Sequence, residues 1–450
     1  MSRLMVSVSG IRGVIGESFT PEVVQRFVAA FGPLMGNKIV VGRDSRVSGP
    51  MVERLVLGTL QAVGCNAVRI GVCPTPTVQL AVENLHADGG IAITASHNPI
   101  QWNALKLIGP DGLFLDEEKG GEVVAQANRG KFNYAAWDRL GRVEDYDRAV
   151  RDHQEAIFNL PYIDVAGLRR RRFRVAIDCV NGAGAVFFPE FLRELGCEVF
   201  ELNCTPNGLF PHTPEPVPQN LTELMAFVRE NQVDVAFAVD PDSDRLAIVS
   251  EKGEPLVEEY TLALAVKFIL SKKRGKVVVN ASTTRAIDDI AVEFGVPVVR
   301  TKVGEVHVAK RIRAEGAVIG GEGNGGVILP DIHLGRDAPV AAALTLQHLL
   351  EFGGPVSALH SSLPQYVIVK RKVDIGRIHP DAVLERLRES HAEETLDLTD
   401  GVKVLRERSW VHLRKSNTEP VIRIIAEAPT REEAEALSDS FLAEIERLRR

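Results

Sequence analysis

One pattern occurs three times along this 450-residue chain and constrains the fold more than any other feature. In each copy, a short run rich in β-branched residues precedes a helical stretch, a glycine and a second apolar run. The first runs of the three copies cover residues 38–43, 174–178 and 276–280. The helical stretches end near Gly64, Gly196 and Gly295, where a helix C-terminus favours glycine. Alternating strands and helices predict the α/β class.

Each copy continues with a second amphipathic stretch, and then with an apolar run that stops at a polar loop. The amphipathic stretches are residues 78–86, 221–230 and 305–314. The apolar runs are residues 91–94, 235–239 and 317–319. Copies of this length are too long for a solenoid repeat. We therefore expect three homologous α/β domains with mixed sheets.

The remainder of the chain has a different pattern. Strand-like runs at residues 367–373, 410–413 and 421–426 precede a long helix that starts at Thr430. This order predicts a C-terminal α+β domain. We place the domains at residues 1–150, 151–256, 257–366 and 367–450, a division that suits the usual domain size.

Charge and cysteine content exclude several classes of protein. The formal net charge of −7 argues against nucleic-acid binding, although a local arginine cluster could still bind a small anion. Five cysteines without a C-x-x-C pair predict no zinc site and suit a reducing compartment. The N-terminus lacks a signal-like apolar core, and no apolar run approaches the ~20 residues of a membrane span. We expect a cytoplasmic protein without membrane contact.

The first polar loop has the sequence TASHNP at residues 94–99. It follows a strand-like run and ends in a proline, so we expect the Ser96 hydroxyl to lie on an exposed loop. An ordinary turn with Ser and Asn as capping residues explains the pattern equally well. His97 could form a hydrogen bond near the serine or be a plain loop residue. No G-x-S-x-G elbow surrounds Ser96, which argues against a hydrolase triad.

The second polar loop places three carboxylates at alternate positions: Asp240, Asp242 and Asp244. Such groups repel one another unless a cation is present, and hard oxygen ligands suit Mg²⁺. A calcium loop is excluded because Arg245 occupies its sixth position, where glycine is required, and an apolar strand follows. A solvated acidic turn is the remaining alternative.

The third polar loop, residues 321–326, is rich in glycine. It contains a formal G-x-G-x-x-G, but an apolar run and a proline follow where a dinucleotide site needs a helix. What remains is Glu322 and Asn324, whose side chains can form hydrogen bonds with sugar hydroxyls. A simple glycine hairpin fits the same pattern.

The fourth loop combines two arginines with hydroxyl and amide side chains, and predicts a phosphate site. Its candidate residues are Arg414, Ser416, Asn417, Thr418 and Arg423. A charged surface hairpin is the alternative. Two further cations, Arg12 between glycines and Lys106 ten residues after Ser96, could equally be solvated surface charges.

These four loops, in this order, resemble those of the α-D-phosphohexomutase superfamily, which includes phosphoglucosamine mutases and phosphomannomutase/phosphoglucomutases. TASHNP and DPDSDR are highly specific motifs, R-x-S-N-T-E-P supports them, and the resemblance covers essentially the whole chain. It implies that the three α/β domains and the C-terminal domain surround one central cleft. It also implies sugar phosphates as substrates. The sequence is compatible with a homodimer.

The resemblance assigns a role to most of the candidate residues, whereas His97 and Asn324 are candidates from their places beside Ser96 and Glu322. Ser96 matches the phosphoserine, and with Asp240, Asp242 and Asp244 it would hold Mg²⁺. The other catalytic candidates are Arg12, His97, Lys106 and Arg245, of which Lys106 matches a general acid/base. Glu322 matches a residue that grips two sugar hydroxyls, with Asn324 beside it. The site for the non-reacting phosphate would be formed by Arg414, Ser416, Asn417, Thr418 and Arg423.

The glycine loop departs from a common family pattern. Many members have G-E-x-S-G-H, whereas this chain has Asn324 in place of Ser and Gly326 in place of His. The G-E-x-N-G-G form is similar to that of archaeal and some bacterial members. We expect a phosphoglucosamine mutase that works through a hexose 1,6-bisphosphate intermediate and primer. The alternatives are a phosphomannomutase/phosphoglucomutase, a sugar phosphatase, or a non-catalytic sugar-phosphate-binding protein.

Overall fold

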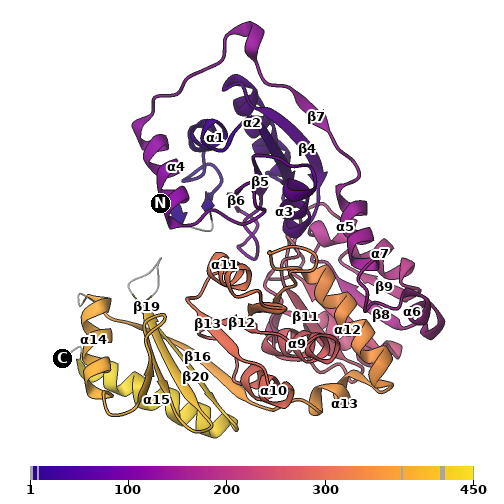
Figure 1. Cartoon of the computed structure of the whole chain (residues 1–450), viewed down its shortest axis with the longest axis vertical. Coiled ribbons are helices and arrows are strands. Elements are labelled where there is room, and N and C mark those ends of the chain that lie inside the picture. Colours follow the sequence, from indigo (N-terminus) through magenta and orange to yellow (C-terminus); the bar gives the residue numbers. More distant parts are fainter. Residues whose placement is uncertain (1–3, 8–9, 377–378, 416–420, 449–450) are drawn as a thin grey trace. The chain divides into compact units, whose positions relative to one another are not determined.

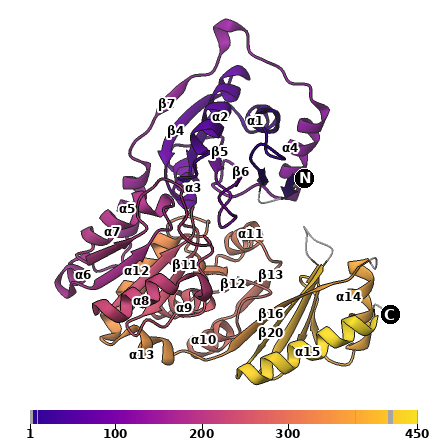
Figure 2. The same cartoon turned by 180° about the vertical axis from the view of Figure 1, so that it is seen from behind.

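The computed structural model describes residues 4–7, 10–376, 379–415 and 421–448, which form two compact units (Figure 1, Figure 2). The first unit comprises Met1–Ala265 and Asn324–His360. The second comprises Val266–Gly323 and Ser361–Arg450.

A seven-stranded mixed sheet forms the first part of the first unit, in the order β1-β2-β6-β5-β3-β4-β7. Its strands are β1 (Met5–Ser7), β2 (Gly10–Val14), β3 (Lys38–Arg43), β4 (Asn66–Val72), β5 (Gly89–Ile93), β6 (Trp102–Ile108) and β7 (Val143–Asp145). Strand β3 runs parallel to β4 and β5, whereas β6 pairs antiparallel with β5 and β2. The helices are α1 (Pro21–Met35), α2 (Gly49–Ala62), α3 (Thr75–Asn84), α4 (Glu117–Arg129) and α5 (Ala149–Phe158).

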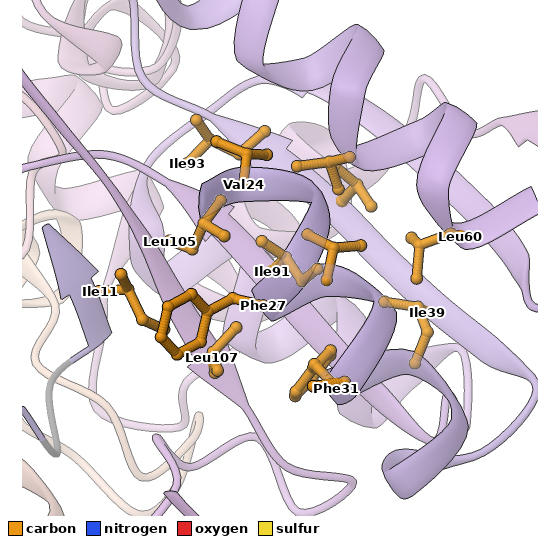
Figure 3. Packing of buried hydrophobic residues seen from close by; sticks show 14 of the residues in the cluster. Ile11, Val24, Phe27, Phe31, Ile39, Leu60, Ile91, Ile93, Leu105 and Leu107 are labelled. Carbon is orange, nitrogen blue, oxygen red and sulfur yellow. The ribbon is translucent and has the colours of Figure 1, made fainter. Parts of the chain in front are cut away.

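Both faces of this sheet are buried. Ile39 contributes to a cluster that also contains Phe27 and Phe31 of α1 (Figure 3). Val41 belongs to the same cluster. Residues of α2 and α4 complete that cluster, while Val40 belongs to a second cluster with residues of α3 and α5. Burial on both faces explains why β3 has a continuous run of apolar residues instead of an alternation of apolar and polar residues.

A second mixed sheet of the first unit has the order β11-β10-β8-β9. Its strands are β8 (Arg174–Asp178), β9 (Glu198–Leu202), β10 (Val235–Val239) and β11 (Leu246–Ser250). The helices of this region are α6 (Val165–Arg171), α7 (Phe188–Glu194) and α8 (Thr222–Asn231). Later chain segments add β15 (Gly326–Ile328) and α12 (Ala338–Phe352). Helices α9 (Glu259–Lys272) and α13 (Val356–Ser361) connect the two units along the chain.

The second unit contains a parallel group of strands and an antiparallel sheet. The parallel strands are β12 (Val277–Asn280), β13 (Val298–Thr301) and β14 (Ile319–Glu322), with helices α10 (Ala286–Phe294) and α11 (Glu305–Glu315). The antiparallel sheet has the order β16-β20-β19-β18-β17. Its strands are β16 (Val367–Asp374), β17 (Thr395–Asp397), β18 (Val402–Leu405), β19 (Trp410–Lys415) and β20 (Val421–Ala428). Helices α14 (Pro380–Ser390) and α15 (Arg431–Leu448) pack on it through one apolar cluster.

The expected α/β units and C-terminal α+β region are confirmed. The three helix-ending glycines have φ angles of 82°, 83° and 65°, the left-handed conformation that glycine adopts without steric cost. The domain limits stay predictions. Within the part of the chain that the structure describes, no helix combines the length and apolarity needed to cross a bilayer.

Three elements of the C-terminal region, β17, β18 and α14, were not predicted. The third copy also differs, because β14 begins at Ile319, where the predicted run ends, and continues through Glu322. Gly320 permits this extension, since a Cβ there would lie 2.2 Å from the carbonyl oxygen of Val278 on the neighbouring strand.

Candidate active site

Ser96 follows β5 in a strained backbone conformation. Its φ angle is 49°, which non-glycine residues adopt rarely and mostly where surrounding contacts enforce it. The backbone N–H of Ser96 donates to Thr94 Oγ1 at 3.0 Å. The residue is only 5% exposed, so the expectation of an exposed loop was wrong. The loop folds inward, and its hydroxyl faces other polar side chains.

Arg46, which the sequence analysis missed, holds this loop in place. Its guanidinium is fully buried and bonds to Asp44 Oδ2 at 3.1 Å, and the same oxygen accepts from Thr94 Oγ1 at 2.6 Å. The guanidinium also donates to three carbonyl oxygens of the loop, those of Ser96, Asn98 and Pro99, and to that of Trp102 at the start of β6. Charged residues immediately after the buried strand β3 were the available sequence signal.

The three carboxylates of the second loop lie between β10 and β11 and are at most 1% exposed. One carboxylate oxygen from each of Asp240, Asp242 and Asp244 can be chosen so that all three lie within 4.8 Å of one another. The intervening Ser243 has a φ of 53°, a second left-handed residue in the site. The structure thus brings the three predicted metal ligands together.

Ser96 lies directly against this carboxylate loop. The Ser96 hydroxyl donates to Asp240 Oδ2 at 2.7 Å, although 144 residues separate the two. Lys106 Nζ donates to Asp242 Oδ2 at 2.6 Å and to Asp244 Oδ2 at 3.2 Å. The serine, the lysine and the three aspartates therefore form one buried polar cluster.

Two more side chains complete the bonding of the Oδ2 atoms, and neither was predicted. Thr75 at the start of α3 donates its hydroxyl to Asp242 Oδ2 at 2.6 Å. Arg336, just before α12, donates from Nη2 to Asp244 Oδ2 at 2.6 Å. No local pattern singles out either residue, because each reaches the loop from a distant part of the chain.

Two oxygens of the cluster have no hydrogen-bond donor. Asp242 Oδ1 and Asp244 Oδ1 are buried without a hydrogen-bond partner, which buried polar atoms rarely are. Burial, with repulsion from Asp244 and Asp242, raises the pKa of Asp240 well above its ordinary value. Buried carboxylate oxygens without donors are ligands that a hard divalent cation prefers, so these residues fit Mg²⁺.

The other predicted catalytic residues contact the serine loop or the carboxylate loop. Arg245 Nε lies 3.6 Å from Asp244 Oδ1, and Arg12 Nη1 donates to Asn98 Oδ1 at 3.4 Å. His97 Nδ1 lies 3.3 Å from Ser96 Oγ. Burial, followed by the nearby Arg245 charge, lowers the pKa of His97 to about 2. Such a shift favours the neutral imidazole, which can still form a hydrogen bond with Ser96.

A second cluster with metal-like geometry contains His153, His333 and Asp337. Asp337 Oδ2 lies 2.8 Å from His153 Nε2 and 2.9 Å from His333 Nε2. The opposite ring nitrogens are also occupied, since His153 Nδ1 bonds to Thr77 Oγ1 and His333 Nδ1 accepts from the N–H of Gly335. With both nitrogens of each ring engaged, this is a hydrogen-bond network and offers no free ligand set.

In the second unit, Glu322 is buried at the end of β14. Its Oε1 accepts from Asn280 Nδ2 and from the N–H of Gly304, both at 2.9 Å. These bonds fix the carboxylate in one orientation. In the first unit, Asn324 Oδ1 accepts from the N–H of Gly326 at 3.2 Å, which closes a tight turn.

Arg414 and Arg423 lie directly opposite each other on β19 and β20, and Lys372 on β16 is opposite Arg423. Like charges in opposite positions destabilise a sheet, so this row of cations favours an anion site. Burial lowers the pKa of Arg414, and its only acidic neighbour among the ion pairs described is Asp400, at 3.8 Å. The predicted phosphate ligands Ser416, Asn417 and Thr418 lie outside the described residues.

The sequence matches known families along nearly its whole length. Residues 3–134, 151–253 and 258–366 match the three families described as phosphoglucomutase/phosphomannomutase, alpha/beta/alpha domains I, II and III. Residues 367–444 match the corresponding C-terminal domain. The chain belongs to the phosphoglucomutase/phosphomannomutase family. It therefore has the four-domain architecture of phosphohexomutases, whose members are mutases.

Individual relatives span the same length. A probable phosphoglucosamine mutase of Methanopyrus kandleri is 42% identical over 441 residues and covers 96% of each chain. A phosphoglucomutase/phosphomannomutase of Thermococcus kodakarensis is 38% identical over 435 residues and covers 94% of each. Among solved structures, a phosphoglucomutase/phosphomannomutase family protein of Burkholderia thailandensis has a TM-score of 0.86 at 27% identity, covering 98% of this chain and 97% of its own.

Proposed function

We propose that this phosphohexomutase is a phosphoglucosamine mutase that interconverts glucosamine 6-phosphate and glucosamine 1-phosphate. The observation that carries the reaction is the Ser96 hydroxyl, which lies 2.7 Å from Asp240 within a buried cluster of three carboxylates. The relatives named probable phosphoglucosamine mutases support the choice of sugar. The G-E-x-N-G-G loop, which is similar to that of archaeal members, supports it as well.

In the proposed reaction, phosphorylated Ser96 transfers its phosphoryl group to a free hydroxyl of the hexose monophosphate. The bond between phosphorus and Ser96 Oγ breaks as a new bond to the sugar oxygen forms. Lys106 donates a proton to the released Ser96 oxygen and takes one from the sugar hydroxyl, so that no proton is gained or lost overall. The product is a hexose 1,6-bisphosphate. After it turns over in the site, its other phosphoryl group returns to Ser96 and restores the phosphoenzyme.

The cations of the first unit stabilise the negative charge that spreads over the transferring group. Mg²⁺, held by Asp240, Asp242, Asp244 and the Ser96 oxygen, would supply further positive charge there. Burial alone would lower the pKa of Lys106, but the adjacent Asp242 and Asp244 raise it above its ordinary value. Lys106 is therefore an ammonium that can donate a proton to the leaving oxygen, while Arg12 and Arg245 act as fixed charges.

The remaining candidates bind the parts of the substrate that do not react. We infer that Glu322 accepts hydrogen bonds from sugar hydroxyls and that Asn324 both accepts and donates them. Arg414 and Arg423 hold the non-reacting phosphate, joined by the predicted ligands Ser416, Asn417 and Thr418. A bidentate arginine contact suits a phosphate in either orientation of the bisphosphate.

A reducing cytoplasm suits this assignment. All five cysteines are free thiols, and four of them are buried. Cytosolic proteins commonly keep their cysteines reduced. A homodimer stays a prediction.

A phosphomannomutase/phosphoglucomutase is the second candidate, because the Thermococcus kodakarensis relative carries that name. Glucosamine, glucose and mannose differ at C2 and share their C3 and C4 hydroxyls. A single contact at C2 contributes only a few kcal/mol, so some overlap among substrates is expected.

The test is kcat/KM for the 1-phosphates of all three sugars, measured with a hexose 1,6-bisphosphate primer. We expect the highest value for glucosamine 1-phosphate. A preference of more than tenfold for mannose or glucose would assign the second candidate. Release of inorganic phosphate in place of isomerisation would identify a phosphatase.

A further inference from the structure

The Arg336 side chain crosses the glycine loop at Gly326. The backbone of Gly326 is not in the left-handed region, so its conformation does not require glycine. A Cβ at this position would, however, lie 2.3 Å from Arg336 Cδ and 2.9 Å from Arg336 Cγ. Real side chains do not approach so closely. The glycine therefore leaves the space through which Arg336 passes.

Beyond Gly326, Arg336 reaches the metal loop. Its Nη2 donates to Asp244 Oδ2 at 2.6 Å, and Lys106 Nζ lies 3.2 Å from the same oxygen. Arg336 and Lys106 therefore both donate hydrogen bonds to the same oxygen of Asp244, Oδ2. The other oxygen, Asp244 Oδ1, has no hydrogen-bond partner and is the one left for a cation.

The chain next to Arg336 is held rigidly by the buried network around Asp337. Asp337 Oδ2 bonds to His153 and His333, and its Oδ1 accepts from the N–H of Val340 to cap α12. The N–H of Asp337 donates to the carbonyl of Val327, the second residue of β15. Arg336 therefore projects from a fixed backbone toward Asp244.

We propose that Arg336 is a positioning residue for the metal ligand Asp244, and that Gly326 is the residue that makes room for it. The inference rests on the proposed metal site. Arg336 acts on the cation in two opposite ways: its charge repels the cation, while its hydrogen bond orients Asp244. Because Asp244 is 1% exposed, water cannot replace the lost donor. Orientation therefore dominates, and removing such a partner typically weakens metal binding about 10–100-fold.

The first test measures metal affinity directly, by calorimetric titration of Mg²⁺ and by electron paramagnetic resonance of bound Mn²⁺. We expect the wild-type protein to bind one ion in this site. Arg336→Met is expected to weaken binding about tenfold or more, and Arg336→Lys to restore part of the loss. Arg148→Met removes an exposed charge from the same unit and serves as the control, with unchanged affinity.

The second test is a double-mutant cycle that perturbs Arg336 from the side of Gly326. Gly326→Ala is expected to displace Arg336 and weaken metal binding by a similar factor in the wild-type background. In an Arg336→Ala background it is expected to have no further effect, because the clashing Cγ and Cδ atoms are gone. Gly58→Ala, on a helix where a Cβ meets nothing within 4 Å, is the control.

The outcomes separate the two claims. If the wild-type protein binds neither ion, the proposed metal site is wrong. If it binds metal and Arg336→Met binds equally well or more tightly, the metal site stands and the role of Arg336 is wrong. If Arg336→Met does not fold, the Gly326→Ala variant alone decides, and an affinity equal to wild type would overturn the proposal.

Discussion

Hydrogen bonds with two side chains hold Ser96 and its loop in place. The left-handed backbone of Ser96 is held by Thr94, and the carbonyls of its loop are held by the buried guanidinium of Arg46. Strain of this kind costs about 1–3 kcal/mol and persists only where neighbouring contacts enforce it. In return, the Ser96 hydroxyl is held in a fixed position against Asp240.

The Ser96→Ala variant tests the phosphoenzyme mechanism. We expect mutase turnover to fall by at least about 10³-fold, because the group that carries the phosphoryl is gone. The midpoint of thermal unfolding should change little, since only one hydroxyl is removed. Intact-mass spectrometry should find a singly phosphorylated fraction in the wild-type protein and none in the variant. Wild-type turnover in Ser96→Ala would refute the mechanism.

At the scale of elements, the strands β16, β20 and β19 place Lys372, Arg423 and Arg414 in one row across the C-terminal sheet. Sheet register alone brings these three cations together, because residues in opposite positions on antiparallel strands have their Cβ atoms about 5 Å apart. Their mutual repulsion is tolerated where an anion is to be bound.

Arg414→Ala is expected to raise KM for the sugar monophosphate and to lower kcat. A charge-assisted hydrogen bond contributes about 1.5–3 kcal/mol, so kcat/KM should fall roughly tenfold to a hundredfold. The kcat is affected because binding of the non-reacting phosphate positions the reacting end.

Steady-state kinetics of Arg414→Ala with glucosamine 1-phosphate provide the measurement. The control is Arg431→Ala, which removes an exposed arginine from the first turn of α15. Kinetics of Arg414→Ala that match those of this control would place the phosphate site elsewhere.

At the scale of the whole molecule, a buried polar network attaches the C-terminal sheet to the preceding part of the second unit. Lys403 Nζ donates to the carbonyl of Ala281 at 2.7 Å and lies 4.0 Å from the centre of the Trp410 ring. Glu427 Oε1 accepts from Trp410 Nε1 and from the N–H of Arg285. Burial is the main reason that the pKa of Lys403 falls to about 7.

This shift predicts a pH dependence of stability. The pKa of Lys403 is lower in the folded protein than the roughly 10.4 of an unfolded chain, so the unfolded state binds more protons between these values. Below pH 7, burying the charged Lys403 side chain lowers the free energy of unfolding by the full amount. This destabilisation disappears as the pH rises toward 10.4. Within that window, Lys403 should raise the free energy of unfolding by about 1.4 kcal/mol per pH unit.

Urea unfolding of the wild-type protein and of Lys403→Met at pH 7, 8, 9 and 10 tests this prediction. We expect the variant to lack the Lys403 contribution, so that its stability relative to wild type declines as the pH rises. Lys302→Met changes an exposed lysine of the same unit and serves as the control. A difference between Lys403→Met and wild type that stays constant with pH would contradict the prediction.

The sequence by itself determined the order of strands and helices and the polar loops that end the strands. These features are local, because hydrophobic periodicity and glycine at helix ends depend on residues a few positions apart. The short strands β17 and β18 escaped prediction since three or four residues carry little periodicity. The motifs around Ser96 and Asp240 pointed to the family because each is contiguous.

Only the tertiary structure decided which distant side chains complete the site. Arg336 and Asp244 are 92 residues apart, and His153 and Asp337 are 184 apart. Neither pair has a sequence signature, because an isolated arginine or histidine is usually a surface or core residue. The burial of Ser96 depends in the same way on Arg46, 50 residues earlier. Such contacts arise when packed sheets and helices bring chain segments together, and no local pattern encodes that distance.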